Sequence, residues 1–122
     1  MDIRLTAELA HANSRAKGWW DEQADLAGNL EPGLVEAEIP AKLCLIHSEI
    51  SEALEEYRSG RAPLEVYSGV NGKPEGLGIE LADAVIRIMD LTEALDIDLG
   101  GCIAEKMRYN ATRPHRHGGK KI

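Results

Sequence analysis

We predict an all-α fold for this chain from two features of its sequence. Apolar residues recur at the spacing of an amphipathic helix in four segments, and no run alternates polar and apolar residues as a half-buried strand does. A chain of 122 residues has the length of one domain and can bury a core without disulfides. We therefore expect a single domain over residues 1–122, with a four-helix core and a basic tail at residues 113–122.

The first predicted helix covers residues 2–17, with Ile3, Leu5 and Leu9 on its apolar side. A glycine directly after this segment is a typical stop signal for a helix. Residues 21–38 are acidic and are interrupted by glycine and proline. We expect them to form a loop.

The second predicted helix begins near Pro40, because proline is favoured in the first helical turn, and it ends at Ser59 before a glycine. Its apolar residues follow spacings of three and four and are expected to face the core. These residues are Leu43, Ile46, Ile50, Leu54 and Tyr57. A neighbouring arc of the same helix carries Glu49, Glu52 and Glu56.

Two further helices follow a long segment rich in glycine and proline, residues 60–78, which is expected to be a loop. The third predicted helix, residues 78–95, is apolar around most of its circumference, as is typical of a buried helix. The fourth covers residues 99–111, with an aspartate near its N-cap. Because the chain has little else to cover the third helix, we expect a homo-oligomer, either a dimer or a tetramer.

Charged residues interrupt the third helix at regular intervals and share one stripe of its surface. They are Glu80, Asp83, Arg87 and Asp90. In the simplest interpretation, the stripe is a solvated edge with an ion pair between Asp83 and Arg87. A helix that is otherwise apolar is normally buried, however, and buried carboxylates need a partner. If the helix is buried, the acidic stripe faces a ligand.

The two helices that carry acids would face each other if they pack antiparallel. Glu49 and Glu52 would then meet Glu80 and Asp83 across a cleft. Four carboxylates at one place repel each other unless cations lie between them. A set of oxygen ligands suits Mg²⁺, or alternatively Mn²⁺. We therefore predict a metal site at these four acids, with a solvated helix face as the alternative for Glu49 and Glu52.

Three segments of the chain carry a resemblance to a known family: "HSEISEALEEYRSG", "PEGLGIELADAVIRIMDL" and "EKMRYNATRPHRHGGK". Together they resemble the MazG-like nucleoside triphosphate pyrophosphohydrolases of the all-α NTP pyrophosphatase superfamily, over roughly residues 40–120. The E-x-x-E and E-x-x-D patterns are weak alone, but their helical setting and the downstream Lys, Asn and Arg make the match more specific. The resemblance implies a four-helix core, obligate oligomers, and Mg²⁺-dependent hydrolysis of a nucleoside triphosphate to monophosphate and pyrophosphate.

The resemblance also implies roles for individual residues. By matching position, Glu49, Glu52, Glu80 and Asp83 become the metal ligands, and Lys106, Asn110 and Arg113 take phosphate-contacting roles. Lys106 and Asn110 are four residues apart and share a helical face, although by themselves they would be ordinary surface residues. A metal ion makes a bound water a stronger nucleophile, while a carboxylate positions the water or accepts its proton. Glu49 or Glu52 is the candidate for that catalytic role.

The only two tryptophans, Trp19 and Trp20, are adjacent, so their indoles point to different sides of the chain. One is expected in the core or a subunit interface, and the other is a candidate for stacking on a nucleobase. Glu56 and Asp90 extend the acidic stripes and are expected to support the metal ligands. Cys44 is expected to be a small buried hydrophobe.

Two other functions compete with hydrolysis of a nucleotide. Glu8 and His11 form one Glu-x-x-His motif of the kind found in di-iron helical bundles, but that scaffold needs a second motif, which the sequence lacks. The other competitor is a non-catalytic helical module that binds a nucleotide or a protein partner without turning it over. Release of pyrophosphate in the presence of Mg²⁺ distinguishes this module from an enzyme.

The net charge of −7 conceals an asymmetry, because residues 105–122 carry six Lys and Arg against one acid. This basic segment is suited to phosphate groups, whereas the acidic remainder argues against binding of duplex nucleic acid. Two cysteines do not indicate a disulfide framework, the N-terminus lacks an apolar leader, and no segment has the length of a membrane span. We expect a cytoplasmic protein without a membrane partner.

Overall fold

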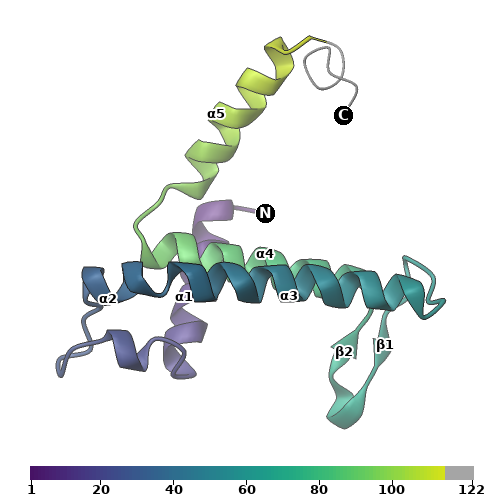
Figure 1. The fold of residues 1–122 in the computed structure, drawn as a ribbon, viewed down its shortest axis with the longest axis horizontal. Helices are drawn as coiled ribbons and strands as arrows, with labels where there is room; N and C mark the ends of the chain where they lie inside the picture. The colour runs from purple at the N-terminus through teal and green to yellow at the C-terminus, as the bar shows by residue number, and fades with distance from the viewer. Residues whose placement is uncertain (115–122) are drawn as a thin grey trace.

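The structure is a computed structural model in which residues 1–114 are described. It is mostly helical, which confirms the predicted all-α class in outline (Figure 1). The described residues form five α-helices, namely α1 (Ile3–Ala16), α2 (Pro32–Ala37), α3 (Ile39–Arg58), α4 (Leu77–Ala94) and α5 (Leu99–Thr112). Most of the predicted basic tail lies outside the described residues.

The four predicted helices correspond to α1, α3, α4 and α5, because local signals set their ends. The Asp2 side chain caps α1 by accepting a hydrogen bond from the Leu5 amide, and Gly18 follows the helix with a φ of 88°. Asp98 caps α5 in the same way, by accepting from the Gly101 amide at 3.1 Å. Pro40 lies in the first turn of α3, as predicted.

Two predicted loops contain regular structure. Residues 21–38 hold a 3-10 turn, η1 (Asp21–Gln23), and α2, which has Pro32 at its start. Residues 60–78 hold an antiparallel hairpin of β1 (Tyr67–Ser68) and β2 (Pro74–Glu75), joined through the 3-10 turn η2 (Val70–Gly72). Both predictions were wrong for the same reason: elements of two to six residues are too short to show a period in the sequence.

The body of the molecule is an antiparallel pair, α3 and α4, with α1 packed across α4 (Figure 1). Its best-buried core cluster is Trp20, Val35 and Leu91. The partly buried residues that pack against this cluster include Leu30, Ile39, Ile46, Ala94 and Leu95. This core is small, and it lies at the end of the α3–α4 pair where α1 and α2 meet it.

One side of the α3–α4 pair is apolar and lies open in the single chain. Of the five residues predicted to face the core from α3, Ile46 packs against it, but the other four are 47 % to 62 % exposed. We call these four, Leu43, Ile50, Leu54 and Tyr57, the α3 stripe. On α4, Leu81 and Val85 are also exposed, so the chain itself buries this helix only in part. Cys44 is exposed too, contrary to expectation. An amphipathic pattern identifies an apolar side but does not say what covers it.

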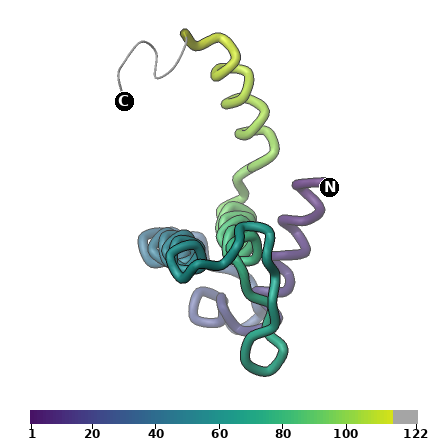
Figure 2. The backbone as a smooth tube through the Cα atoms, turned by 90° about the vertical axis from the view of Figure 1, so that its right-hand side faces the viewer, coloured from purple at the N-terminus to yellow at the C-terminus, as the bar shows by residue number. Residues whose placement is uncertain are grey.

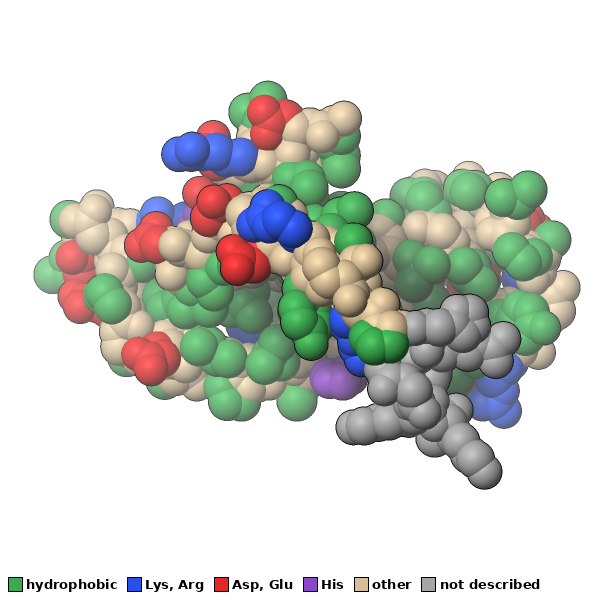
Figure 3. All heavy atoms as spheres, turned by 90° about the horizontal axis from the view of Figure 1, so that it is seen from above, with side chains coloured by type: hydrophobic (Ala, Val, Ile, Leu, Met, Phe, Trp, Pro, Cys, Tyr) green, Lys and Arg blue, Asp and Glu red, His purple; other side chains and the backbone are tan. Residues whose placement is uncertain are grey.

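Helix α5 stands away from the body. All its residues from Gly101 to Thr112 are exposed, and its main contact is with α1. Figure 2 shows α5 leaving the α3–α4 pair on the side opposite the β1–β2 hairpin. Figure 3 looks onto the side from which α5 rises, and hydrophobic side chains gather there on the body around it. The four-helix core predicted from the sequence is therefore not formed within one chain's described residues.

None of the described helices combines the length and the apolar character needed to cross a membrane.

Candidate metal centre

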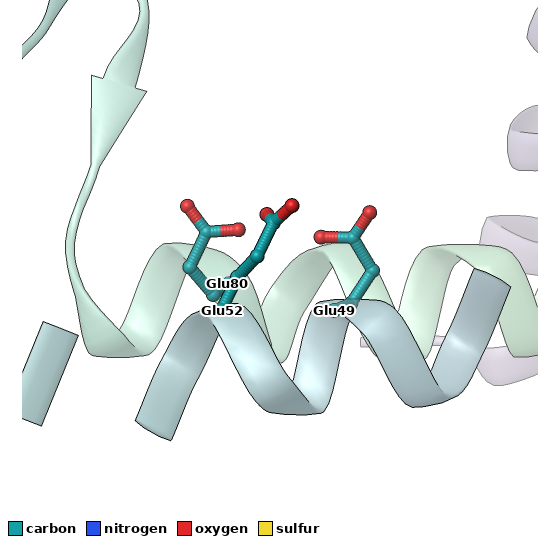
Figure 4. A group of neighbouring side chains, drawn as sticks. All are labelled: Glu49, Glu52 and Glu80. Atoms are coloured by element: carbon teal, nitrogen blue, oxygen red, sulfur yellow. The ribbon is translucent and has the colours of Figure 1, made fainter. Parts of the chain in front are cut away.

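Three carboxylates from two helices converge on the side of the α3–α4 pair that faces the hairpin. Glu49 and Glu52 are one turn apart on α3, and Glu80 lies in the first turns of the antiparallel α4. One oxygen from each carboxylate lies within 4.8 Å of the other two. Figure 4 shows all three side chains pointing to the same side of the two helices. We call these three residues the acidic cluster.

The acidic cluster is unusually well buried for a group of like charges. Glu49 is 6 % exposed and Glu80 is 4 % exposed. Each has one buried oxygen, Oε2, with no hydrogen-bond partner among the described residues. Because a buried carboxylate without a partner is costly, such atoms are expected where a ligand binds.

The pKa of Glu80 is raised because this carboxylate is buried among like charges. It is raised from 4.5 to about 7, chiefly by burial and also by a hydrogen bond with Glu52 and the negative charges of Glu52, Asp83 and Glu49. Near neutral pH, the Glu80 side chain is therefore divided between a protonated and an ionised form. A proton or a metal cation relieves the repulsion, and the two compete for the same oxygens.

One basic side chain reaches the acidic cluster from α4. Arg87 Nε donates to Glu49 Oε1 at 2.9 Å, across the interface between the two helices. The ion pair of the simplest interpretation, between Asp83 and Arg87, is therefore not the one that forms. Arg87 neutralises a single carboxylate, so within residues 1–114 neither Glu52 nor Glu80 has a basic partner.

Asp83, the fourth predicted ligand, lies at the edge of the acidic cluster. It follows Glu80 by one turn of α4 and is half-buried, but it is not among the three carboxylates within 4.8 Å of one another. It is close enough for its charge to raise the pKa of Glu80. It also lines the adjoining cavity. The structure thus brings three predicted ligands together and places the fourth beside them.

A cavity of about 200 Å³ adjoins the acidic cluster, and Asp83 and Arg87 belong to its wall. The lining also includes Asn13, Trp19 and Lys42. Trp19 is 58 % exposed, and Lys42 Nζ lies 5.9 Å from the centroid of its ring. An aromatic face with polar and cationic neighbours suits a planar ligand that carries negative charge.

The two tryptophans differ as predicted, since one belongs to the core. Trp20 is 1 % exposed, and its Nε1 donates to Asp90 Oδ1 at 2.9 Å. The same carboxylate accepts from Ser14 Oγ at 2.7 Å and lies 2.7 Å from His11 Nδ1. Asp90 therefore joins α1, α4 and the turn that carries Trp20, and only Trp19 remains available to a ligand.

Glu56, the other acid expected to support the ligands, holds the hairpin instead. Tyr67 Oη donates to both Glu56 oxygens at 2.8 Å, and the pKa of Tyr67 is raised to about 12, chiefly by this hydrogen bond. The guanidinium of Arg61 lies 3.8 Å from the centroid of the Tyr67 ring. Glu56 thereby fixes the position of the hairpin beside the acidic cluster.

The candidate phosphate-contacting residues are not brought to the acidic cluster within one chain. Lys106 and Asn110 are exposed on α5, and Arg113 is its C-cap residue. Because α5 rises on the side opposite the hairpin, whereas the acids face the hairpin, these side chains lie on the other side of the body from the cluster (Figures 2 and 4).

The Glu-x-x-His motif of α1 does not form a metal site. The Glu8 carboxylate is exposed and contacts Arg4 at 3.4 Å, whereas His11 is turned inward to Asp90. The structure thus gives no support to the di-iron alternative.

Sequence reasoning missed one residue near the acidic cluster, Lys42, and the partner of another, Arg87. Lys42 precedes Glu49 by seven residues, which places both on one side of α3, and this spacing is a signal that could have been used. The contact of Arg87 with Glu49 has no such signal, because the two residues belong to different helices.

Comparisons of the chain with models of protein families, with curated proteins and with solved structures gave no match.

Proposed function

We propose that this protein is a Mg²⁺-dependent nucleoside triphosphate pyrophosphohydrolase of the MazG-like kind. The observation that carries the proposal is the pair of buried carboxylate oxygens, on Glu49 and Glu80, without a partner among the described residues. Together with Glu52 they form an all-oxygen donor set, which suits a hard divalent cation. Asp83 is positioned to join this set or to hold a water of the bound ion.

The proposed reaction is attack of water on the α-phosphorus, with cleavage of the bond between that phosphorus and the bridging oxygen to the β-phosphate. The products are a nucleoside monophosphate and pyrophosphate. Mg²⁺, or Mn²⁺, bound at the acidic cluster would neutralise the charge that builds on the phosphoryl oxygens. Glu52 is exposed and has no cationic partner among the described residues, unlike Glu49, so we assign it to position the water and accept its proton.

The substrate side of the proposal uses the cavity beside the acidic cluster. Trp19 offers an exposed ring on which a nucleobase can stack, and Asp83, one of the proposed metal ligands, lines the same cavity. Trp20 is given no substrate role, because its indole is in the core. Lys106, Asn110 and Arg113 remain the proposed phosphate contacts, and they need a route to the cluster.

A homo-oligomer is part of the proposal, and the α3 stripe supports it. A second copy packed on this stripe would cover Leu54 and Tyr57 as well as Leu81 on α4, and two α3–α4 pairs would then complete a four-helix core. A dimer satisfies this requirement, and a tetramer can be built from two dimers. We propose a cytoplasmic location and neither duplex nucleic acid nor a membrane as a partner.

The decisive experiment is an assay of pyrophosphate release with a panel of canonical and modified nucleoside triphosphates, in Mg²⁺ and in EDTA. The proposal expects release from at least one triphosphate that depends on the metal. Metal-dependent binding of a nucleotide without release would instead assign the chain as a non-catalytic nucleotide-binding module. Absence of both binding and release would contradict both functions.

A further inference from the structure

A second cavity, of about 650 Å³, lies between α1, α2 and the end of α4 (Figure 1). It shares no lining residue with the cavity beside the acidic cluster. No residue of the α3 stripe lines it either, so it is separate from the surface proposed for a second copy. A cavity of this volume has the size of a site for a small organic molecule.

Much of the lining of this second cavity is apolar and belongs to the core. Val35 is a member of the core cluster, and Leu30, Ile39 and Leu95 pack against that cluster. Ile97 adds a side chain that is exposed. A ligand with an apolar body would remove this surface from water, and the removal of apolar surface from water favours binding.

The imidazole of His11 also lines the second cavity, and Asp90 fixes its orientation. The side chain of His11 is 13 % exposed, and its Nδ1 lies 2.7 Å from Asp90 Oδ1. Asp90 accepts from Ser14 and Trp20 as well, so with the imidazole neutral its hydrogen is on Nδ1 and Nε2 is an acceptor. Asp90 is not part of the lining, and Nε2 has no hydrogen-bond partner in residues 1–114. A ligand that bonds to Nε2 must therefore be a donor.

The charged residues of the lining are mostly acidic. Glu36, Glu93 and Asp96 belong to it, and none of them forms an ion pair among the described residues. Glu93 is half-buried, whereas the other two are exposed. Arg15 is the one arginine or lysine of the lining, and it donates to the carbonyl of Gly28. Three acids against one arginine favour a cationic ligand over an anionic one.

We propose that the second cavity binds an organic ammonium ion with an apolar body. The body would lie against Val35 and Leu95, and the ammonium would donate to His11 Nε2 and to Glu93. Glu93 follows Asp90 by three residues on α4, so it lies one turn beyond the carboxylate that holds His11. The inference goes beyond the proposed function, because it uses neither the metal nor the nucleotide.

The first test varies the ligand. The probe is 2-phenylethylamine, which has both an ammonium and an apolar body, and binding is measured by NMR titration at pH 8 in saturating Mg²⁺. Three matched compounds each change one property: 2-phenylethanol lacks the charge, 3-phenylpropanoate reverses it, and ethylamine lacks the apolar body. We expect 2-phenylethylamine to bind about tenfold more tightly than each of the three. The proposal is overturned if the amine does not bind, or if any of the three binds equally well.

The second test locates the ammonium with three variants that each replace a glutamate by glutamine. Glu93→Gln acts in the second cavity, Glu80→Gln acts in the acidic cluster, and Glu55→Gln acts at an exposed residue that is paired with Arg58. We expect Glu93→Gln to raise the Kd for 2-phenylethylamine about fivefold, and the other two variants to leave it unchanged. A loss of binding in Glu80→Gln but not in Glu93→Gln would place the ammonium at the acidic cluster and overturn the proposal.

The third measurement follows the ring of His11 itself. In protein labelled with ¹⁵N at histidine, the Nε2 resonance of His11, assigned by its loss in His11→Gln, should shift as 2-phenylethylamine saturates the wild type. An unchanged resonance at saturation would overturn the contact with His11. None of these titrations contains a nucleotide, so their failure would leave the proposed function intact. Failure of the pyrophosphate assay would likewise leave the second cavity to be decided by binding.

Discussion

Two residues on different sides of α3 are buried in the opposite order from the one their chemistry predicts. Glu49, on the acidic side, is 6 % exposed, whereas Leu54, five residues later on the other side, is 55 % exposed. Burial of a carboxylate without full pairing costs free energy, and exposure of leucine forgoes the free energy that burial would provide. A single chain therefore carries both costs at once. Each cost is offset if the acidic side binds a cation and the apolar side binds a second copy.

The largest expected effect is on the acidic side. Glu80→Gln keeps the size of the side chain but removes a charge that would bind the metal, so pyrophosphate release should fall by about 10²-fold or more. The matched control is Glu55→Gln, an exposed glutamate of α3 that is paired with Arg58 outside the acidic cluster. Steady-state kinetics in saturating Mg²⁺ measures both variants. Equal activities would show that burial of the acids has no part in catalysis.

A comparison of two leucines tests the apolar side. Leu91→Ala removes a side chain that is 6 % exposed in the core cluster, and it should lower the free energy of unfolding by about 2–5 kcal/mol. Leu54→Ala, in the α3 stripe, should cost the dissociated chain less than about 1 kcal/mol and should instead weaken the assembly. Chemical denaturation at low and high protein concentration separates the two effects. A concentration-independent loss at Leu54 as large as that at Leu91 would place the stripe inside the folded chain.

The pH dependence of stability should have a sign opposite to that of an ordinary surface carboxylate. The pKa of Glu80 is raised in the folded state, to about 7 from 4.5, so the folded protein holds this proton more tightly than the unfolded chain does. The stabilisation is complete below pH 4.5 and is lost as the pH rises to about 7; its size is on the order of 3 kcal/mol.

Denaturant titrations in EDTA at pH 5 and pH 8 measure this loss. In Glu80→Gln the dependence should become much flatter, because no proton is bound at that position. Addition of Mg²⁺ at pH 8 should restore stability to the wild type, since the cation replaces the proton. A wild type that is equally stable at both pH values would show that the acidic cluster is better solvated than its burial indicates.

The smallest expected effect distinguishes the two tryptophans. Trp19→Ala should raise the KM for the nucleotide about tenfold through loss of stacking, with little change in the melting temperature, because its ring is exposed. Trp20→Ala should instead destabilise the fold by about 3–5 kcal/mol. Differential scanning calorimetry and kinetics on both variants give the comparison. An unchanged KM in Trp19→Ala would remove the cavity from the substrate site.

Much of the candidate site could be predicted because its members are close in the sequence. Glu49 and Glu52 share a side of one helix through a spacing of three, and Glu80 and Asp83 repeat this spacing on the next long helix. The hairpin and α2 could not be predicted, because they are shorter than the periods that reveal a strand or a helix. The role of Asp90 was also hidden, since its partner His11 lies 79 residues away in the chain.

The sequence by itself determined where the long helices begin and end and which side of each is acidic or apolar, because capping residues and helical periodicity act over a few neighbours. Only the tertiary structure decided that Arg87 pairs with Glu49, that Trp20 rather than Trp19 enters the core, and that the α3 stripe stays open. These outcomes depend on which helices pack and at what depth. They are set by contacts between residues far apart in the chain. A periodic pattern within one segment does not predict such contacts.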